Sequence, residues 1–142
     1  MQTHVEFRSG RFPAYDGEEE QINPGIWGKR LAEFLRDSLR VEGFETGELI
    51  AEDWGWIVPI ANQPFSLWIG CANYQYPDGF LCFIHPQTPF VRRLLRKIDT
   101  RERVASLQRA MDKILTEPAG IREKRWWTHA EFTNPASHQS QG

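Results

Sequence analysis

Apolar and polar residues alternate along several stretches of the chain, and each alternation predicts a β-strand. Such alternation occurs in residues 4–8, 49–60, 65–74 and 80–85. Turn sequences separate the last three stretches: Asn62-Gln63-Pro64 precedes one, and Pro77-Asp78-Gly79 precedes the next. Proline and glycine supply the backbone angles that a tight turn needs. These three stretches are therefore predicted to form an antiparallel meander.

Two other stretches carry apolar residues at helical spacing, with charged residues between them. The first follows Asn23-Pro24, a favoured start for a helix, and extends from Trp27 to Gly43. The second follows Asp99, and its apolar stripe runs from Val104 to Leu115. Because each helix is apolar along one side only, both are expected to pack on one face of the sheet.

The remaining segments complete the predicted architecture. Residues 88–98, which begin with Thr88-Pro89, suggest a short helical turn, and residues 121–132 suggest a last strand or an ordered arm. The predicted order is β-α-β-β-β-α with a possible last strand, an α+β fold whose antiparallel sheet has three to five strands. Residues 1–133 form one domain in this prediction, and the small polar residues 134–142 a disordered tail.

Simple hairpin registers assign the meander's side chains to two faces. Pairing Ile60 with Phe65, and Cys71 with Cys82, gives one wholly apolar face for the helices: Trp54, Trp56, Val58, Leu67, Ile69, Cys71, Cys82 and Ile84. The opposite, outer face is also mostly apolar, although a solvated face should be polar. It holds Asp53, Gly55, Ile57, Trp68, Gly70, Ala72, Leu81, Phe83 and His85.

Three explanations of this apolar outer face remain open. Residues 121–132 or the N-terminal strand could fold over it, or two copies of the chain could associate through it. In the third explanation it binds another protein, because aromatic residues are enriched at the centres of interfaces.

The charge is unevenly distributed along the 142 residues, whose formal net charge is −2. Residues 41–91 contain six acidic residues and no Lys or Arg, whereas residues 92–142 are basic. The absence of an overall basic excess argues against a general nucleic-acid binder. The sequence shows neither an apolar run long enough for a membrane span nor a signal peptide, so we expect a cytoplasmic protein without membrane contact.

Few residues form a pattern typical of chemistry. Cys71 and Cys82 face each other in the predicted register and are interpreted as reduced core thiols, with a disulfide as the alternative. Asp16 and Glu18–Glu20 form an acidic loop, interpreted as solvated or, secondly, as a contact for a basic partner. No metal-ligand spacing and no cofactor motif is present.

A basic cluster lies in the segment expected to be helical, where it is interpreted as a polar helix face and, alternatively, as a phosphate contact. Its members are Arg92, Arg93, Arg96 and Lys97.

The sequence favours a non-enzymatic protein-binding module over an enzyme. The predicted partner-binding residues are acidic or lie on the outer face: Glu48, Glu52, Asp53, Trp68, Phe83 and His85. A compact α+β domain with an acidic, tryptophan-bearing sheet resembles, in size and surface, the small immunity proteins with which bacteria block toxins. That resemblance implies an inhibitor of another protein, and the acidic residues imply a basic partner. The alternatives are a small enzyme or ligand-binding domain, with Asp53 and His85 in a pocket on the outer face, and a structural homodimer.

Overall fold

The computed structural model describes residues 1–116 and 120–134 and shows an α+β fold around an antiparallel sheet. The sheet has six strands in the order β2-β3-β4-β5-β1-β8, more than the three to five expected. These strands are β1 (Gln2–Arg8), β2 (Ile50–Glu52), β3 (Gly55–Ala61), β4 (Leu67–Asn73), β5 (Gly79–His85) and β8 (Arg122–Thr128). A separate two-stranded hairpin consists of β6 (Phe90–Arg93) and β7 (Arg96–Asp99). The helices are α1 (Glu18–Gln21), α2 (Lys29–Val41), α3 (Arg101–Thr116) and α4 (His129–Thr133).

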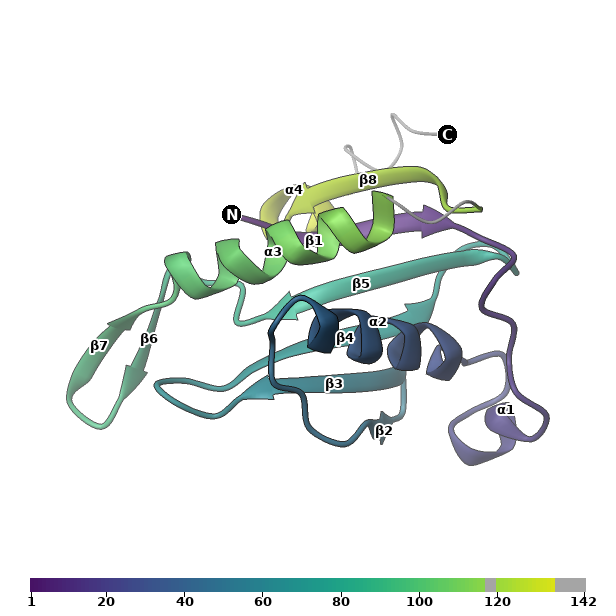
Figure 1. Cartoon of the computed structure of the whole chain (residues 1–142), viewed down its shortest axis with the longest axis horizontal. Helices are drawn as coiled ribbons and strands as arrows, with labels where there is room; N and C mark the ends of the chain where they lie inside the picture. The colour runs from purple at the N-terminus through teal and green to yellow at the C-terminus, as the bar shows by residue number, and fades with distance from the viewer. Residues whose placement is uncertain (117–119, 135–142) are drawn as a thin grey trace.

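The hydrophobic core lies between the sheet and the two long helices. Helices α2 and α3 contact each other and lie over the same side of the sheet (Figure 1). Their apolar stripes are buried, with Leu35 and Leu107 completely inaccessible to solvent. The strands supply the other half of the core: Val5, Phe7, Trp56, Val58, Leu67, Ile69, Cys71, Phe80, Cys82 and Ile84.

The predicted register is confirmed for one hairpin and wrong for the other. Cys71 pairs with Cys82 as predicted. In the preceding hairpin, however, Cys71 pairs with Trp56 instead of Trp54, so the register differs by two residues. Because side chains alternate with a period of two, an even shift leaves each strand residue on its predicted face.

Trp54 is the exception, and its assignment to the core is wrong. Residues 49–60 are not one strand, because Asp53 and Trp54 form a turn between β2 and β3. Outside the regular pleat, the Trp54 ring is directed to the outer face, where it contacts Trp68 and Phe83.

Helix α2 begins later than predicted, at Lys29 rather than near Asn23-Pro24. Trp27 therefore precedes the helix, and its backbone is tied to β4. The Trp27 N–H donates to Asn73 Oδ1 at 3.1 Å, and its carbonyl accepts from the Asn73 N–H at 2.9 Å. The expected stop is borne out in position, since α2 ends at Val41, just before Gly43.

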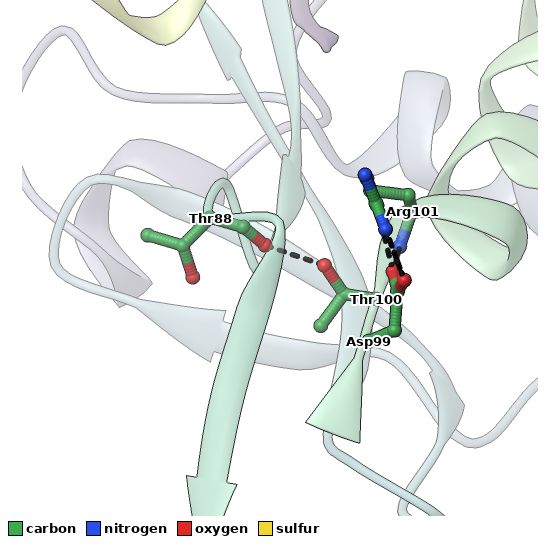
Figure 2. Close-up of polar contacts among 4 residues, drawn as sticks. All are labelled: Thr88, Asp99, Thr100 and Arg101. Carbon is green, nitrogen blue, oxygen red and sulfur yellow. Dashed lines mark hydrogen bonds and ion pairs between the residues drawn. The ribbon is translucent and has the colours of Figure 1, made fainter. Parts of the chain in front are cut away.

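The short helical turn expected at residues 88–98 is wrong, because this segment forms the β6–β7 hairpin. Thr100 holds the base of the hairpin, because its hydroxyl donates to the Thr88 carbonyl (Figure 2). Its N–H also donates to the Pro89 carbonyl at 2.9 Å. The carboxylate of Asp99 accepts from the Arg101 N–H at 2.9 Å and forms an ion pair with the Arg101 guanidinium. The apolar residues of this segment therefore belong to a hairpin. A short apolar pattern does not distinguish a hairpin from a helical turn.

The last segment, residues 121–132, contributes both strand β8 and most of helix α4. A capping box starts α4, because the Thr128 and Glu131 side chains each bond to the other residue's N–H. Of the tail predicted at 134–142, all but Asn134 lies outside the described residues. Within the described part of the chain, no helix has both the length and the apolarity to cross a membrane.

Candidate functional site

The outer face of the sheet carries a continuous series of ring contacts, here called the aromatic cluster. Trp54 and Trp68 are stacked with ring centroids 6.3 Å apart, and Trp68 stacks on His85 at 4.7 Å. Phe83 touches both tryptophans and stacks on His4 at 5.8 Å. The series then continues through helix α4 towards the β4–β5 turn. Its members are Trp54, Trp68, Phe83, His85, His4, Phe132 and Tyr74.

A missing side chain makes room for these rings. Gly70 lies opposite Phe83 in the register, and a Cβ on Gly70 would come within 2.4 Å of Phe83 Cζ and 2.8 Å of Trp54 Cη2. Both distances are far below van der Waals contact. The Phe83 and Trp54 rings therefore lie directly over the Gly70 backbone, in space that any other residue's side chain would occupy.

The chain's own C-terminal helix covers one half of the cluster. Phe132 of α4 stacks on His4 at 4.7 Å, and His4 is only 5% exposed. Burial, helped by the nearby imidazole of His129, lowers the pKa of His4 to about 4. Trp127 of β8 is buried beside them and donates from Nε1 to Glu6 at 3.1 Å. In this half of the outer face the first of the three explanations applies, because residues 121–132 cover it.

The other half of the cluster remains accessible. Trp54, Trp68 and Phe83 are partly buried and His85 is exposed. Partial burial against the Trp68 ring lowers the pKa of His85. Three of the residues predicted from the sequence, Trp68, Phe83 and His85, therefore come together as expected.

The predicted acidic residues lie along the β2 edge of the same region. Glu48, Glu52 and Asp53 are all exposed. Asp53 occupies the β2–β3 turn next to Trp54, and its backbone carbonyl accepts from Asn23 Nδ2 at 2.9 Å. Carboxylates thus lie along one edge of the sheet beside the accessible rings, which suits a partner that combines an apolar contact with basic side chains.

Asp53 and His85 do not come together. Asp53 precedes Gly55, which lies beside Ala72, whereas His85 pairs with Trp68. Four residues of an extended strand separate these two rows, about 13 Å. That distance exceeds what a proton donor and acceptor acting on one substrate group require.

One cavity, of about 410 Å³, lies beside the β4–β5 turn between Glu6, Tyr74 and Arg125, at the Tyr74 end of the aromatic cluster. Another lies between the β3–β4 loop and the β6–β7 hairpin, where Pro64 and Arg93 are among its lining residues. Neither is lined by Asp53 or His85. Within the described residues, no group of three or more His, Cys, Asp or Glu side chains could hold a metal ion.

The acidic loop has a structural role that the sequence interpretation missed. Glu18 is 2% exposed, so it is not solvated as expected. Its Oε2 accepts from the Gly28 and Lys29 N–H groups at 2.8 and 2.9 Å and from Trp56 Nε1 at 2.9 Å. Glu18 therefore supplies the carboxylate that the first turn of α2 needs. Glu19 and Glu20 remain exposed.

The two cysteines are thiols in the core, with sulfur atoms 3.8 Å apart. Burial raises the pKa of Cys82, which disfavours its reactive thiolate. Both side chains are directed away from the aromatic cluster, on the face covered by the helices.

Four members of the aromatic cluster were missed from the sequence: Trp54, His4, Tyr74 and Phe132. A signal existed for three of them. Tyr74 follows Trp68 and Ala72 at a spacing of two, which places it on the outer face. His4 precedes the core residue Val5 in an alternating strand, which places it on the outer face. Asp53-Trp54-Gly55 also contains a turn-forming Asp and Gly, which could have divided the long strand. Phe132 reaches the sheet only through the fold-back of α4, which no local pattern shows.

The fold and the surface define an α+β protein with a half-covered aromatic face on an antiparallel sheet. No family profile, curated protein or solved structure matches the chain.

Proposed function

We propose that the protein is a non-enzymatic protein-binding module. Its binding surface comprises the accessible half of the aromatic cluster (Trp54, Trp68, Phe83 and His85) and the acidic edge (Glu48, Glu52 and Asp53). The expected occupant is a basic protein surface with an apolar centre, and inhibition of that protein is the form of function we favour. The two free thiols agree with a reducing, cytoplasmic location.

The observation that supports this proposal is the unequal coverage of one aromatic face. On the β1 and β8 side, His4 and Trp127 are buried, whereas Trp68 and Phe83 are partly exposed and His85 is exposed. Contiguous exposed apolar surface with a polar rim is typical of protein interaction sites.

The rings are also suited to binding because they are held in place before a partner arrives. Stacking on His85 and Trp54 restricts the Trp68 ring, and the Gly70 backbone supports Phe83 from below. Rigid aromatic side chains lose little conformational entropy on binding. Such residues dominate the energy of many interfaces.

Photo-crosslinking from the face can test the proposal in living cells. A photoreactive phenylalanine at position 68 should crosslink to one protein, whereas the same group at Arg109, on the exposed side of α3, should not. The captured protein is then purified and titrated with wild type, Trp68→Ala and Asp53→Ala. We expect Trp68→Ala to weaken binding about 30-fold or more, as at an aromatic hot spot, and Asp53→Ala to weaken it less and mainly at low salt.

Circular dichroism melting gives the control for folding, because both side chains lie outside the core. Equal affinity of wild type and both variants for the captured protein would place the interface elsewhere. A crosslink between two copies of the chain would support the homodimer instead.

A further inference from the structure

The β6–β7 hairpin ends in two leucines that the fold does not use. Leu94 is 97% exposed and Leu95 is 99% exposed. The hairpin extends beyond the sheet and helices at one end of the molecule (Figure 1). Leu94 also has a φ of 57°, in the left-handed region that favours Gly or Asn. Neither burial nor turn geometry thus accounts for leucine at the tip, which indicates a role in binding.

Four cations lie directly behind this tip. Arg93 is paired with Arg96 across the hairpin, and Arg92 with Lys97. Like charges in directly opposite positions destabilise a strand pair. Over residues 1–116 and 120–134, none of the four forms an ion pair with an acidic side chain. An external anionic surface would relieve this repulsion.

The base of the hairpin is firmly held, so the tip has a defined direction. Thr100 is completely buried and bonds to both Thr88 and Pro89, as part of Figure 2 shows. Nearer the tip, the Arg93 guanidinium donates to the carbonyls of Asn62 and Pro64 in the β3–β4 loop at 2.8 and 3.0 Å. The leucines therefore lie at the tip of a hairpin that is bonded to the rest of the fold.

We propose that this hairpin binds an anionic lipid surface, with Leu94 and Leu95 inserted among the acyl chains. Arg92, Arg96 and Lys97 would then lie at the depth of the lipid phosphates. Neighbouring strand residues are directed to opposite sides of a ribbon, so cations occur on both sides of the hairpin. Lipid phosphates surround a hairpin that enters end-on, whereas a protein surface usually meets one side. The charge arrangement therefore favours a lipid surface.

This inference is independent of the proposed protein-binding function, and it departs from the expectation of no membrane contact. That expectation considered spanning segments. A surface-bound protein needs no span, because a few inserted apolar side chains and nearby cations suffice for reversible attachment.

Vesicle co-sedimentation tests the proposal with the full chain. Vesicles of phosphatidylcholine with phosphatidylglycerol should bind the protein, and added salt should weaken the binding. Vesicles of phosphatidylcholine alone should bind it much less. The variant Arg92→Gln/Arg96→Gln should weaken binding about 30-fold, since each cation near an anionic surface contributes about fivefold.

The leucines are tested with Leu94→Asn/Leu95→Ser. Asn tolerates the left-handed conformation at position 94, so this variant should melt at or above the wild-type temperature while binding vesicles more than about tenfold more weakly. Val41→Ser is the matched control for an exposed apolar residue, because Val41 is 87% exposed on α2. Arg40→Gln/Arg109→Gln is the control for charge. Both controls should bind like wild type.

Three outcomes would overturn the proposal. The wild-type chain could fail to sediment with the anionic vesicles at low salt, or the leucine variant could bind them as tightly as wild type. In the third outcome, single-stranded DNA competes fully with vesicles and the leucine variant retains DNA binding. That result would show that the hairpin cations bind a polyanion instead of a lipid surface.

Discussion

His4 shows how the covered half of the aromatic cluster constrains a single side chain. Its imidazole lies between the rings of Phe83 and Phe132, and the Thr3 hydroxyl lies 3.0 Å from its Nδ1. A protonated imidazole would lose hydration there without gaining a carboxylate partner. The pKa of His4 is accordingly lowered, and the histidine is neutral in the folded protein at pH 7.

This lowered pKa predicts a loss of stability in mild acid. The unfolded chain binds the proton near pH 6.5, whereas the folded chain binds it only near the His4 pKa of about 4. The contribution of neutral His4 to the free energy of unfolding is therefore complete above pH 6.5. This free energy falls by about 2–3 kcal/mol as the pH is lowered towards 4. Urea unfolding between pH 7.5 and pH 4 measures the change.

The matched variants for this experiment are His4→Phe and His85→Asn. His4→Phe should remove most of the pH dependence, because a phenyl ring keeps the stacking without the titrating nitrogen. His85→Asn should retain most of it, because His85 is exposed. The same slope in all three proteins would show that another group titrates in this range.

The contact between α1 and α2 shows that a helix can be capped by a distant side chain. Gly28 provides no side chain at the N-terminus of α2, and Glu18 supplies its carboxylate to the free N–H groups there. The same oxygen accepts from Trp56 of β3. One buried carboxylate thus joins the N-terminal loop, helix α2 and strand β3.

Glu18→Gln should therefore be strongly destabilising. A carboxamide replaces one acceptor oxygen with an NH₂ group. Because both oxygens of the Glu18 carboxylate accept from N–H groups, the NH₂ group would face an N–H donor in either orientation. We expect a loss of about 2–4 kcal/mol in the free energy of unfolding, measured by urea denaturation. Glu20→Gln on the same short helix is the control, and its exposed side chain should change stability by less than about 0.5 kcal/mol. Equal effects of the two substitutions would contradict the capping role.

The acidic β2–β3 turn and the cationic hairpin lie towards different ends of β3. The β2–β3 turn with Asp53 is at one end of β3, whereas Arg93 of the hairpin bonds to residues just beyond the other end. Because β3 has seven residues, its length is about 20 Å. For Asp53 this separation exceeds the Debye length of about 8 Å at physiological salt, so its charge is largely screened from the hairpin. Glu48 lies nearer the hairpin, because the neighbouring Gly47 bonds to Pro59 near the other end of β3.

Neutralising the acidic residues at the β2–β3 turn should separate the two proposed functions. Glu52→Gln/Asp53→Asn should weaken binding to the captured basic protein and leave vesicle binding within about twofold of wild type. Titration with the partner and vesicle co-sedimentation measure the two effects. If overall charge alone governed vesicle binding, this variant would bind vesicles distinctly more tightly, and the localised hairpin site would be contradicted.

Local sequence patterns were sufficient for the α+β class, the two long helices and the β4–β5 register. Alternation with a period of two is a property of each strand, which is why Trp68, Phe83 and His85 were placed on one face. The Leu94-Leu95 hairpin was not distinguishable from a helical turn, because a short apolar run fits both periods.

The tertiary structure decided what lies over each face and which charges are buried. The burial of Glu18 and the coverage of His4 by Phe132 join residues far apart in the sequence, so no local pattern contains them. The exposure of the hairpin leucines likewise depends on how far β6 and β7 extend from the packed layers. Periodicity determines the direction of a side chain, whereas its surroundings depend on the three-dimensional meeting of distant elements.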